Sequence, residues 1–139
     1  AKALQKAEQT GEPAVALQLE NGKIITGKTS DWLGSSAALL LNALKELADI
    51  DDGVELISPI IIEPIQKLKT EHMGNRNPRL HTNEILLALS ICAATNPTAE
   101  LAMEQLEKLR KYLIQLADQL NFTLEQLERS RNDTETKKL

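Results

Sequence analysis

The fold of this chain is decided by the stretch Ala14-Val15-Ala16-Leu17-Gln18-Leu19-Glu20-Asn21-Gly22-Lys23-Ile24-Ile25-Thr26. Its first half alternates, so that Val15, Leu17 and Leu19 share one face of a strand and residues 16, 18 and 20 share the other. Asn21-Gly22 is the strongest short signal for a hairpin turn, because both residues tolerate positive φ. Residues 23–26 are rich in β-branched side chains, which suit a return strand. The stretch therefore predicts a β-hairpin.

The segments around the hairpin have the patterns of helices. Residues 2–9 predict a helix that Gly11 and Pro13 end. Four more are expected: from a cap at Ser35 or Ser36 to about residue 48, from Ser58-Pro59 to residue 72, from a Thr82 cap to about residue 94, and a long one after Asn96-Pro97. The predicted fold class is α+β: an N-terminal β-hairpin packed on a mostly helical layer, with a long C-terminal helix.

Finer expectations accompany this outline. Pro64 should kink or split its helix, and Val54–Ile57 has the composition of a short strand. The helix from residue 83 to about residue 94 has almost no polar face, which predicts burial on most of its sides. Asn121 should end the long helix, and Thr123 with Gln126 should start a short terminal one.

Composition excludes some classes of protein. The 139 residues fit one domain, and 42% of them are hydrophobic, but only 2% are aromatic, so the core must be aliphatic. The net charge is −4 and the isoelectric point is near 5.2. Nucleic-acid binding is not expected as the main function, because phosphate neutralisation requires an excess of Lys and Arg.

Cysteine usage and hydropathy indicate a cytoplasmic protein. Cys92 is the only cysteine, so no internal disulfide can form, which is typical of a reducing compartment. Its apolar neighbours favour an inert core thiol over a nucleophile. No apolar run is long enough to span a bilayer, and no secretion signal is evident. We expect no membrane association.

Residues 22–29, Gly22-Lys23-Ile24-Ile25-Thr26-Gly27-Lys28-Thr29, match the phosphate-binding loop pattern G-x-x-x-x-G-K-[ST]. That loop wraps backbone N–H groups around phosphates directly before a helix. Ile24 and Ile25 suit a strand better than a tight anion nest, and Trp32 and Gly34 interrupt any helix that would begin at Lys28. The hairpin is the better interpretation.

A polar loop at residues 72–81 is the most plausible site. Residues 67–81 carry a net charge of +3 in an otherwise acidic chain, since their one acidic residue is Glu71 and their basic residues are Lys67, Lys69, Arg76 and Arg79. Fork-shaped arginine donors suit a phosphate or a carboxylate, and function concentrates on loops. The candidate anion-binding residues are Asn75, Arg76, Asn77, Arg79 and His81. The alternative is that these side chains only brace the loop by bonding backbone carbonyls, with Asp49–Asp52 as acidic partners.

Other chemistry near this loop has less support. Three possible metal ligands lie near this loop, namely His72, His81 and Glu84. Their spacing is not specific to a metal site, so no metal site is predicted. His81 is the candidate for a general acid or base, by residue type alone. Gly34-Ser35-Ser36-Ala37 lacks the second glycine of a nucleophile elbow and is a helix cap instead. Neither a cofactor nor a reaction follows from the sequence, and whether the chain belongs to an enzyme stays open.

The predicted long helix carries a seam at Ala102, Leu106, Leu109, Leu113, Leu116 and Leu120. Such spacing is typical of a helix face that packs in the core. The alternative interpretation is a face through which two copies of the chain pair. Residues 1–127 are expected to form a single α+β domain, and the charged residues 128–139 a frayed tail.

Several segments resemble a known bacterial family: Asn21–Ser30, Glu63–Lys69, Gly74–His81 (Gly-Asn-Arg-Asn-Pro-Arg-Leu-His) and Asn83–Leu86. The chain is similar to the C-terminal region of the uncharacterised family named domain of unknown function 1846, over about residues 1–110. After Arg110 it departs, since the family continues with a polar motif and a strand where this chain extends a helix. The resemblance implies a cytosolic bacterial protein and a missing N-terminal part, but no function.

Two hypotheses follow for the function. In the first, the chain is an accessory domain of a phosphate- or nucleotide-handling protein, with the 72–81 loop as its anion-binding element. In the second, it is a structural or oligomerisation module that binds no ligand.

Overall fold

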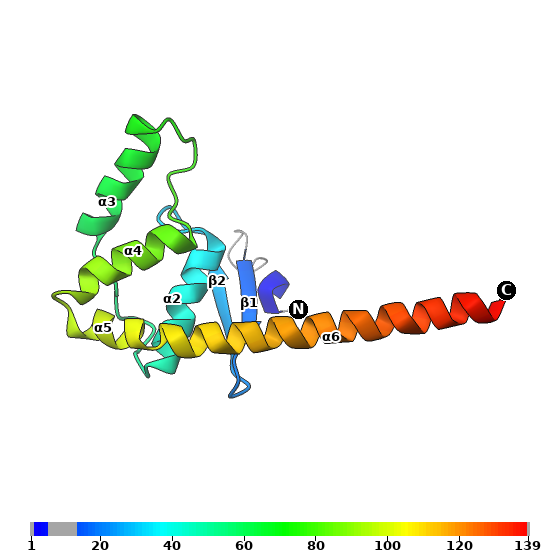
Figure 1. The fold of residues 1–139 in the computed structure, drawn as a ribbon. Helices are drawn as coiled ribbons and strands as arrows, with labels where there is room; N and C mark the ends of the chain where they lie inside the picture. The colour runs from blue at the N-terminus through cyan, green and yellow to red at the C-terminus, as the bar shows by residue number, and fades with distance from the viewer. Residues whose placement is uncertain (1, 6–13, 139) are drawn as a thin grey trace. The chain divides into compact units, whose positions relative to one another are not determined.

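The computed structural model describes residues 2–5 and 14–138, with side chains through residue 134. The elements are strands β1 (Ala14–Gln18) and β2 (Ile24–Lys28), helices α2 (Ser35–Leu47), α3 (Pro59–Lys67), α4 (Thr82–Ala93), α5 (Pro97–Glu104) and α6 (Leu106–Lys138), and the π-helix η1 (Leu68–His72), as Figure 1 shows. The α+β class, the hairpin and the long C-terminal helix are thus confirmed. The expected helix at residues 2–9 is helical at residues 2–5, and the rest of it lies outside the described residues.

The hairpin forms as its alternation requires. β1 and β2 pair antiparallel with Ala14 opposite Lys28 and Gln18 opposite Ile24. The turn is wider than two residues, because the Leu19 N–H bonds the Lys23 carbonyl at 2.8 Å and Gly22 adopts a φ of 88°. Val15, Leu17 and Leu19 do share one face, and this face is less exposed than that of residues 16, 18 and 20, with Leu19 only 3% exposed.

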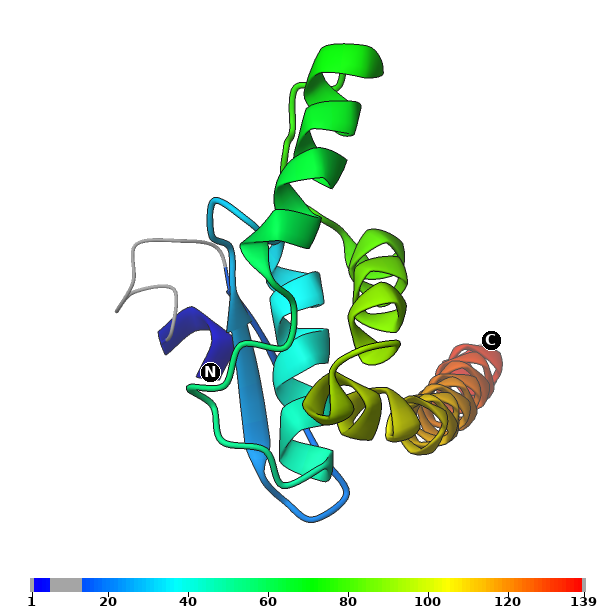
Figure 2. The ribbon, with the colours of Figure 1, turned by 90° about the vertical axis from the view of Figure 1, so that its left-hand side faces the viewer.

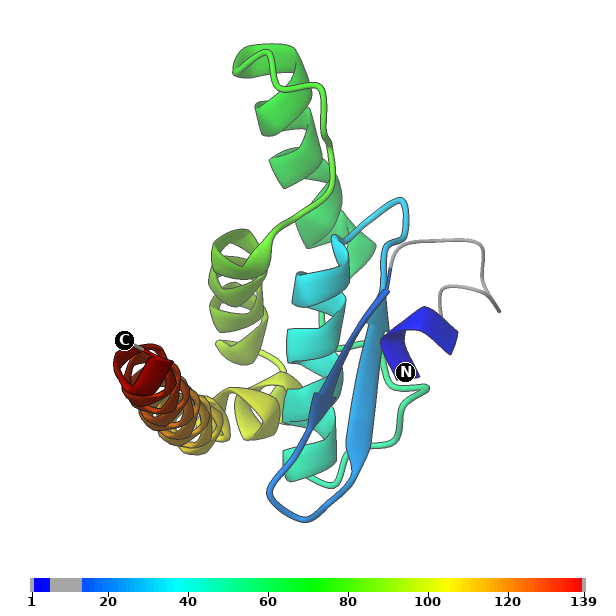
Figure 3. The same cartoon turned by 90° about the vertical axis from the view of Figure 1, so that its right-hand side faces the viewer.

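Helix α2 lies between two layers. The hairpin covers one side of it, and α4 and α5 cover the other (Figures 2 and 3). β2 approaches α2 closely at Gly27, where an added Cβ would lie 2.5 Å from the Ser35 carbonyl oxygen and against the Leu39 backbone. The glycine that completes the phosphate-loop pattern is therefore required for packing. Asn42 secures the contact by donating to the Thr26 carbonyl at 2.8 Å.

Several local expectations were wrong. Residues 54–57 form no strand. Pro64 does not split its helix, because α3 runs unbroken through it to Lys67 and continues into η1, whereas a kink at Pro64 stays a prediction. The N-cap of α2 is Gly34, without a side-chain cap, and the N-cap of α4 is His81 rather than Thr82. Ser58 does cap α3, since its hydroxyl accepts from the Ile60 N–H at 3.3 Å.

Helix α4 buries only one of its apolar faces. Ile85 and Leu89 are fully buried, whereas Leu87 and Ile91 are 65% and 56% exposed. The expected burial on most sides was therefore wrong. Cys92, on the inner face, is buried as expected.

The chain forms two compact units, Ala1–Leu106 and Glu107–Leu139. The predicted long helix is interrupted at Gln105, where α5 ends, and it does not end at Asn121, because α6 continues to Lys138. Residues 128–138 are helical, and their fraying stays a prediction. No helix in the described part of the chain is long and apolar enough to cross a membrane.

Candidate functional site

Two loops meet where α2 and α4 begin. Leu33 and Leu80 form an isolated parallel bridge, in which the Leu80 N–H bonds the Trp32 carbonyl at 2.9 Å and the Gly34 N–H bonds the Leu80 carbonyl at 3.1 Å. Because the bridge is parallel and each segment leads directly into a helix, both helices start at the same place. The 72–81 loop is thereby held against residues 29–34, about 45 positions earlier in the sequence.

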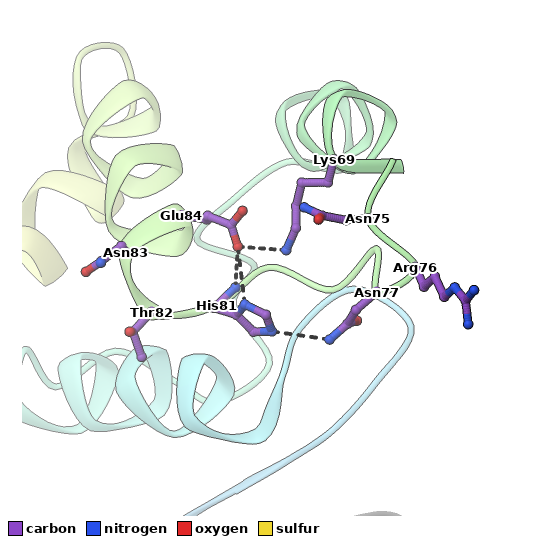
Figure 4. A pocket seen from close by; sticks show the side chains of 8 residues that line it. All are labelled: Lys69, Asn75, Arg76, Asn77, His81, Thr82, Asn83 and Glu84. Carbon is purple, nitrogen blue, oxygen red and sulfur yellow. Dashed lines mark hydrogen bonds and ion pairs between the residues drawn. The ribbon is translucent and has the colours of Figure 1, made fainter. Parts of the chain in front are cut away.

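A first cavity of about 580 Å³ opens beside this bridge. Figure 4 shows the side chains that line it, among them Lys69, Asn75, Arg76, Asn77, His81 and Glu84. Lys69 Nζ lies 2.8 Å from Glu84 Oε1 and donates to the Arg79 carbonyl at 2.5 Å. Lys69 is only 5% exposed, so its charge is compensated inside the protein rather than by water.

Glu84 connects this ion pair to the start of α4. The same Oε1 accepts from the His81 backbone N–H at 2.9 Å and lies 3.7 Å from His81 Nδ1. Burial alone would raise the pKa of Glu84. The hydrogen bonds from Lys69 and from the His81 N–H, with the charges of Lys69 and His81, more than offset that effect and hold the pKa of Glu84 below its usual value.

Lys69 is the residue that sequence reasoning missed. It was counted in the local charge but not assigned to the site. Its position results from η1, because the wider π turn changes the angle at which the following side chains leave the helix. π-turns are frequent at functional sites. The one sequence feature that could have indicated this π-turn is Pro64, four residues before η1 begins.

A second cavity of about 450 Å³ also borders His81. It shares Asn77, His81 and Thr82 with the first and adds Thr29, Ser35, Ser36 and Arg79 among others. None of its lining residues carries a carboxylate, and Arg79 is its one residue with a permanent charge. The first turn of α2, which has no side-chain cap and no acidic residue, borders it.

The structure divides the five candidate anion ligands between these cavities. Asn77 and His81 border both, and the Asn77 Nδ2 lies 3.3 Å from the His81 Nε2. Asn75 and Arg76 border only the first, where Arg76 points away from the Lys69–Glu84 pair in Figure 4. Arg79 borders only the second, and its Nε donates to the Ser30 carbonyl at 2.5 Å.

The other candidates are not brought together. Within residues 2–5 and 14–138, no three His, Cys, Asp or Glu side chains are grouped closely enough to hold a metal ion, so His72 does not join His81 and Glu84. Among the described contacts, the expected partners at residues 49–52 do not pair with the loop either. In the described structure the Asp52 carbonyl instead accepts from Lys45, at 3.2 Å.

Fold and site together define a helix-rich α+β domain with a cationic polar loop between two helix N-termini. The family model "Domain of unknown function DUF1846, C-terminal" matches residues 1–127, so the chain belongs to this family. The resemblance inferred from the sequence is thus confirmed.

Curated relatives agree with this assignment. A UPF0371 protein of Corynebacterium efficiens is 60% identical over 110 residues, which are 79% of this chain and 22% of the relative. One from Corynebacterium glutamicum (strain R) is 58% identical over 110 residues, with the same two shares. One from Streptococcus pyogenes serotype M1 is 58% identical over 106 residues, 76% of this chain and 22% of the relative. The chain spans about a fifth of the length of the curated relatives it matches.

Proposed function

We propose that this chain is an accessory domain of a larger cytoplasmic protein that handles phosphate or nucleotide ligands. In this proposal Arg79, Asn77 and His81 hold an anionic group in the second cavity. The observation that carries it is the chemistry of that cavity, which has a volume of about 450 Å³, an arginine and no carboxylate among its lining residues. A phosphate group requires such a surplus of donors.

Three further features support an anion there. The Ser30 carbonyl takes only Nε of Arg79, which leaves the guanidinium's other four N–H donors. Ser35, Ser36 and Thr29 add hydroxyl donors to the lining. The first N–H groups of α2 have no intrahelical acceptor and no capping side chain, and the helix dipole favours negative charge at this end.

The first cavity provides room for the rest of such a ligand. It shares His81 and Asn77 with the anion cavity and measures about 580 Å³, so each volume is in the range of small-molecule sites. Its lining mixes the carboxylate of Glu84 with Asn75 and Arg76, a set that both donates and accepts. This favours a polar, uncharged group, such as a sugar or a base, beside the phosphate.

The test is a thermal-unfolding screen with phosphate, pyrophosphate and nucleoside di- and triphosphates. A ligand at one hundred times its Kd stabilises by about 2.7 kcal/mol. The key variant is Ser36→Asp, which puts a carboxylate into the anion cavity. An acidic residue in the first turn stabilises a helix by about 0.3–1 kcal/mol, so this variant should fold at least as well as the wild type.

We expect Ser36→Asp to abolish the ligand-induced shift while the midpoint without ligand stays equal or rises. The matched control is Asn21→Asp, which adds the same charge at the exposed hairpin turn and should leave the shift unchanged. A shift that survives Ser36→Asp, or no shift with any anion, would refute the proposal.

A second candidate is a structural or oligomerisation module without a ligand. It is favoured by the bond from Arg79 to the Ser30 carbonyl, since bracing the loop would by itself explain that arginine. In that case Arg79→Ala lowers the unfolding midpoint, and no anion shifts the midpoint of the wild type.

A further inference from the structure

The carboxylate of Glu84 uses only one of its two oxygens within the described protein. Oε1 lies 2.8 Å from Lys69 Nζ and accepts from the His81 backbone N–H at 2.9 Å. In Figure 4 the dashed contacts of Glu84 all end on this oxygen, and Oε2 has no hydrogen bond or ion pair with any described residue. The side chain is 30% exposed and lines the first cavity, so a ligand there can reach Oε2.

The free oxygen is suited to hydroxyl groups. Its contacts with Lys69 and His81 hold the pKa of Glu84 below its usual value, so the carboxyl is ionised at neutral pH and can only accept hydrogen bonds. A carboxylate oxygen has two lone pairs, which allows Oε2 to accept from two adjacent hydroxyls of one molecule. A phosphate would be repelled here, so the charged group of a ligand belongs in the other cavity.

The other residues that line the first cavity favour a sugar over a base. They contribute the amides of Asn75, Asn77 and Asn83 and the hydroxyl of Thr82, groups that both donate and accept. A nucleotide base is commonly held by stacking on aromatic or apolar side chains. None of the lining residues is apolar, and the one ring among them is the His81 imidazole. The first cavity therefore offers many partners to hydroxyls and little stacking surface to a base.

A single imidazole ring separates the groups that would hold the two parts of the ligand. His81 Nδ1 lies 3.7 Å from Glu84 Oε1, and His81 Nε2 lies 3.3 Å from Nδ2 of Asn77, which borders both cavities. A sugar is about as wide as such a ring. We propose that the ligand is a sugar phosphate, whose phosphate lies in the anion cavity at Arg79 and whose adjacent hydroxyls donate to Glu84. This inference rests on the proposed function, because the bound phosphate determines where the sugar lies.

The test is calorimetric titration of the full 139-residue chain with inorganic phosphate and two matched pairs of sugars. The pairs are ribose 5-phosphate with 2-deoxyribose 5-phosphate, and glucose 6-phosphate with 2-deoxyglucose 6-phosphate. Within a pair only one hydroxyl differs, so the comparison requires no variant. One hydrogen bond to a charged group is worth about tenfold in Kd. In at least one pair we expect the parent sugar to bind about tenfold more tightly than its deoxy analogue.

The outcomes separate this inference from the anion site. If neither pair shows a preference while Ser36→Asp still weakens the binding of phosphate and sugar phosphates alike, the sugar assignment is overturned and the anion site stands. If none of the five compounds binds, both are refuted.

Glu84→Gln tests the carboxylate itself. The amide keeps the shape and one acceptor oxygen for Lys69 and the His81 N–H, but it turns an NH₂ donor toward the hydroxyls. We expect the preferred sugar phosphate to bind about tenfold more weakly. Inorganic phosphate should bind no more weakly, because a negative charge near the anion has been removed. A Glu84→Gln chain that keeps the preference of the wild type would overturn the proposal.

Two controls accompany this variant. Glu71→Gln makes the same change on a side chain that is 62% exposed and lines neither cavity, so it should leave both affinities unchanged. Circular dichroism checks that each variant is folded.

Adenosine 5′-monophosphate distinguishes a free sugar phosphate from a nucleotide. It adds a base to a phosphorylated ribose, and the lining of the first cavity offers that base no apolar surface. We therefore expect it to bind no more tightly than ribose 5-phosphate. Stacking of a base would increase the affinity about tenfold. An increase of that size would overturn the free sugar phosphate as the ligand.

Discussion

Replacing Lys69 by methionine tests the network that holds the candidate site. Methionine keeps the volume of the aliphatic chain but removes the charge, so Glu84 Oε1 loses its partner at 2.8 Å and the Arg79 carbonyl loses its donor. Removing one partner of a fully buried ion pair costs about 3–5 kcal/mol. The Glu84 side chain is 30% exposed, and water therefore compensates part of this loss. We expect a decrease of about 2–3 kcal/mol in the free energy of unfolding.

The assay is urea unfolding at neutral pH, with thermal unfolding beside it. At about 4 °C per kcal/mol for a chain of this size, the midpoint should fall by about 8–12 °C. Lys67→Met is the matched control. Lys67 is exposed, and its Nζ lies 3.9 Å from Glu71 Oε2, so its loss should cost less than about 0.5 kcal/mol.

The pH dependence separates the ion pair from mere packing. Because the pKa of Glu84 is lowered in the folded chain, its contribution to stability is present above its ordinary pKa of 4.5 and is lost as the pH falls through the lowered value. The penalty of Lys69→Met should therefore shrink below pH 4.5, where the carboxyl becomes protonated. A penalty that is independent of pH, or no larger than that of Lys67→Met, would refute the reasoning.

Three further predictions concern the rest of the chain. Gly27→Ala should cost at least about 3 kcal/mol in urea unfolding or prevent folding, because the new Cβ would collide with the backbone of α2 at Ser35 and Leu39; a near-neutral effect would show that β2 can withdraw. The buried thiol of Cys92 should react with a disulfide reagent only as fast as the protein unfolds, and a fast reaction in native buffer would contradict its burial. Backbone amides of residues 128–138 should exchange with deuterium much faster than those of α4, since none of the described side chains at residues 128–134 is buried. Equal protection would show that the tail is not frayed.

Local sequence signals predicted much of the fold. Alternation and Asn21-Gly22 predicted the hairpin and the residues that share each face of its first strand, and Ser58-Pro59 predicted the start of α3. These signals act within a few residues of the feature they specify. Where the signals conflicted, prediction failed: Asn121 and Thr123 resemble a helix end and a new cap, yet α6 continues through both. Weak propensities of this kind do not outweigh an otherwise continuous helix.

The candidate site could be predicted only in part. The 72–81 loop was singled out by its surplus of arginine and amide side chains, and Asn77, Arg79 and His81 do gather at one cavity. The sequence could not assign Lys69 or Ser36 to the site. The position of Lys69 depends on the π turn of η1, and that of Ser36 depends on the bridge between two loops that are far apart in the chain.

The sequence by itself determined the α+β class, the hairpin, the family and the polar character of the loop. The class, the hairpin and the character of the loop follow from periodicity, turn chemistry and residue type, which are properties of short segments. The family follows from the resemblance of several such segments to its members. Only the tertiary structure decided that Arg76 and Arg79 serve different cavities, that Glu84 is paired with a buried lysine, and that Gly27 is needed against α2. The physical reason is that such contacts join residues far apart in the chain, and the packing of whole elements sets their distances.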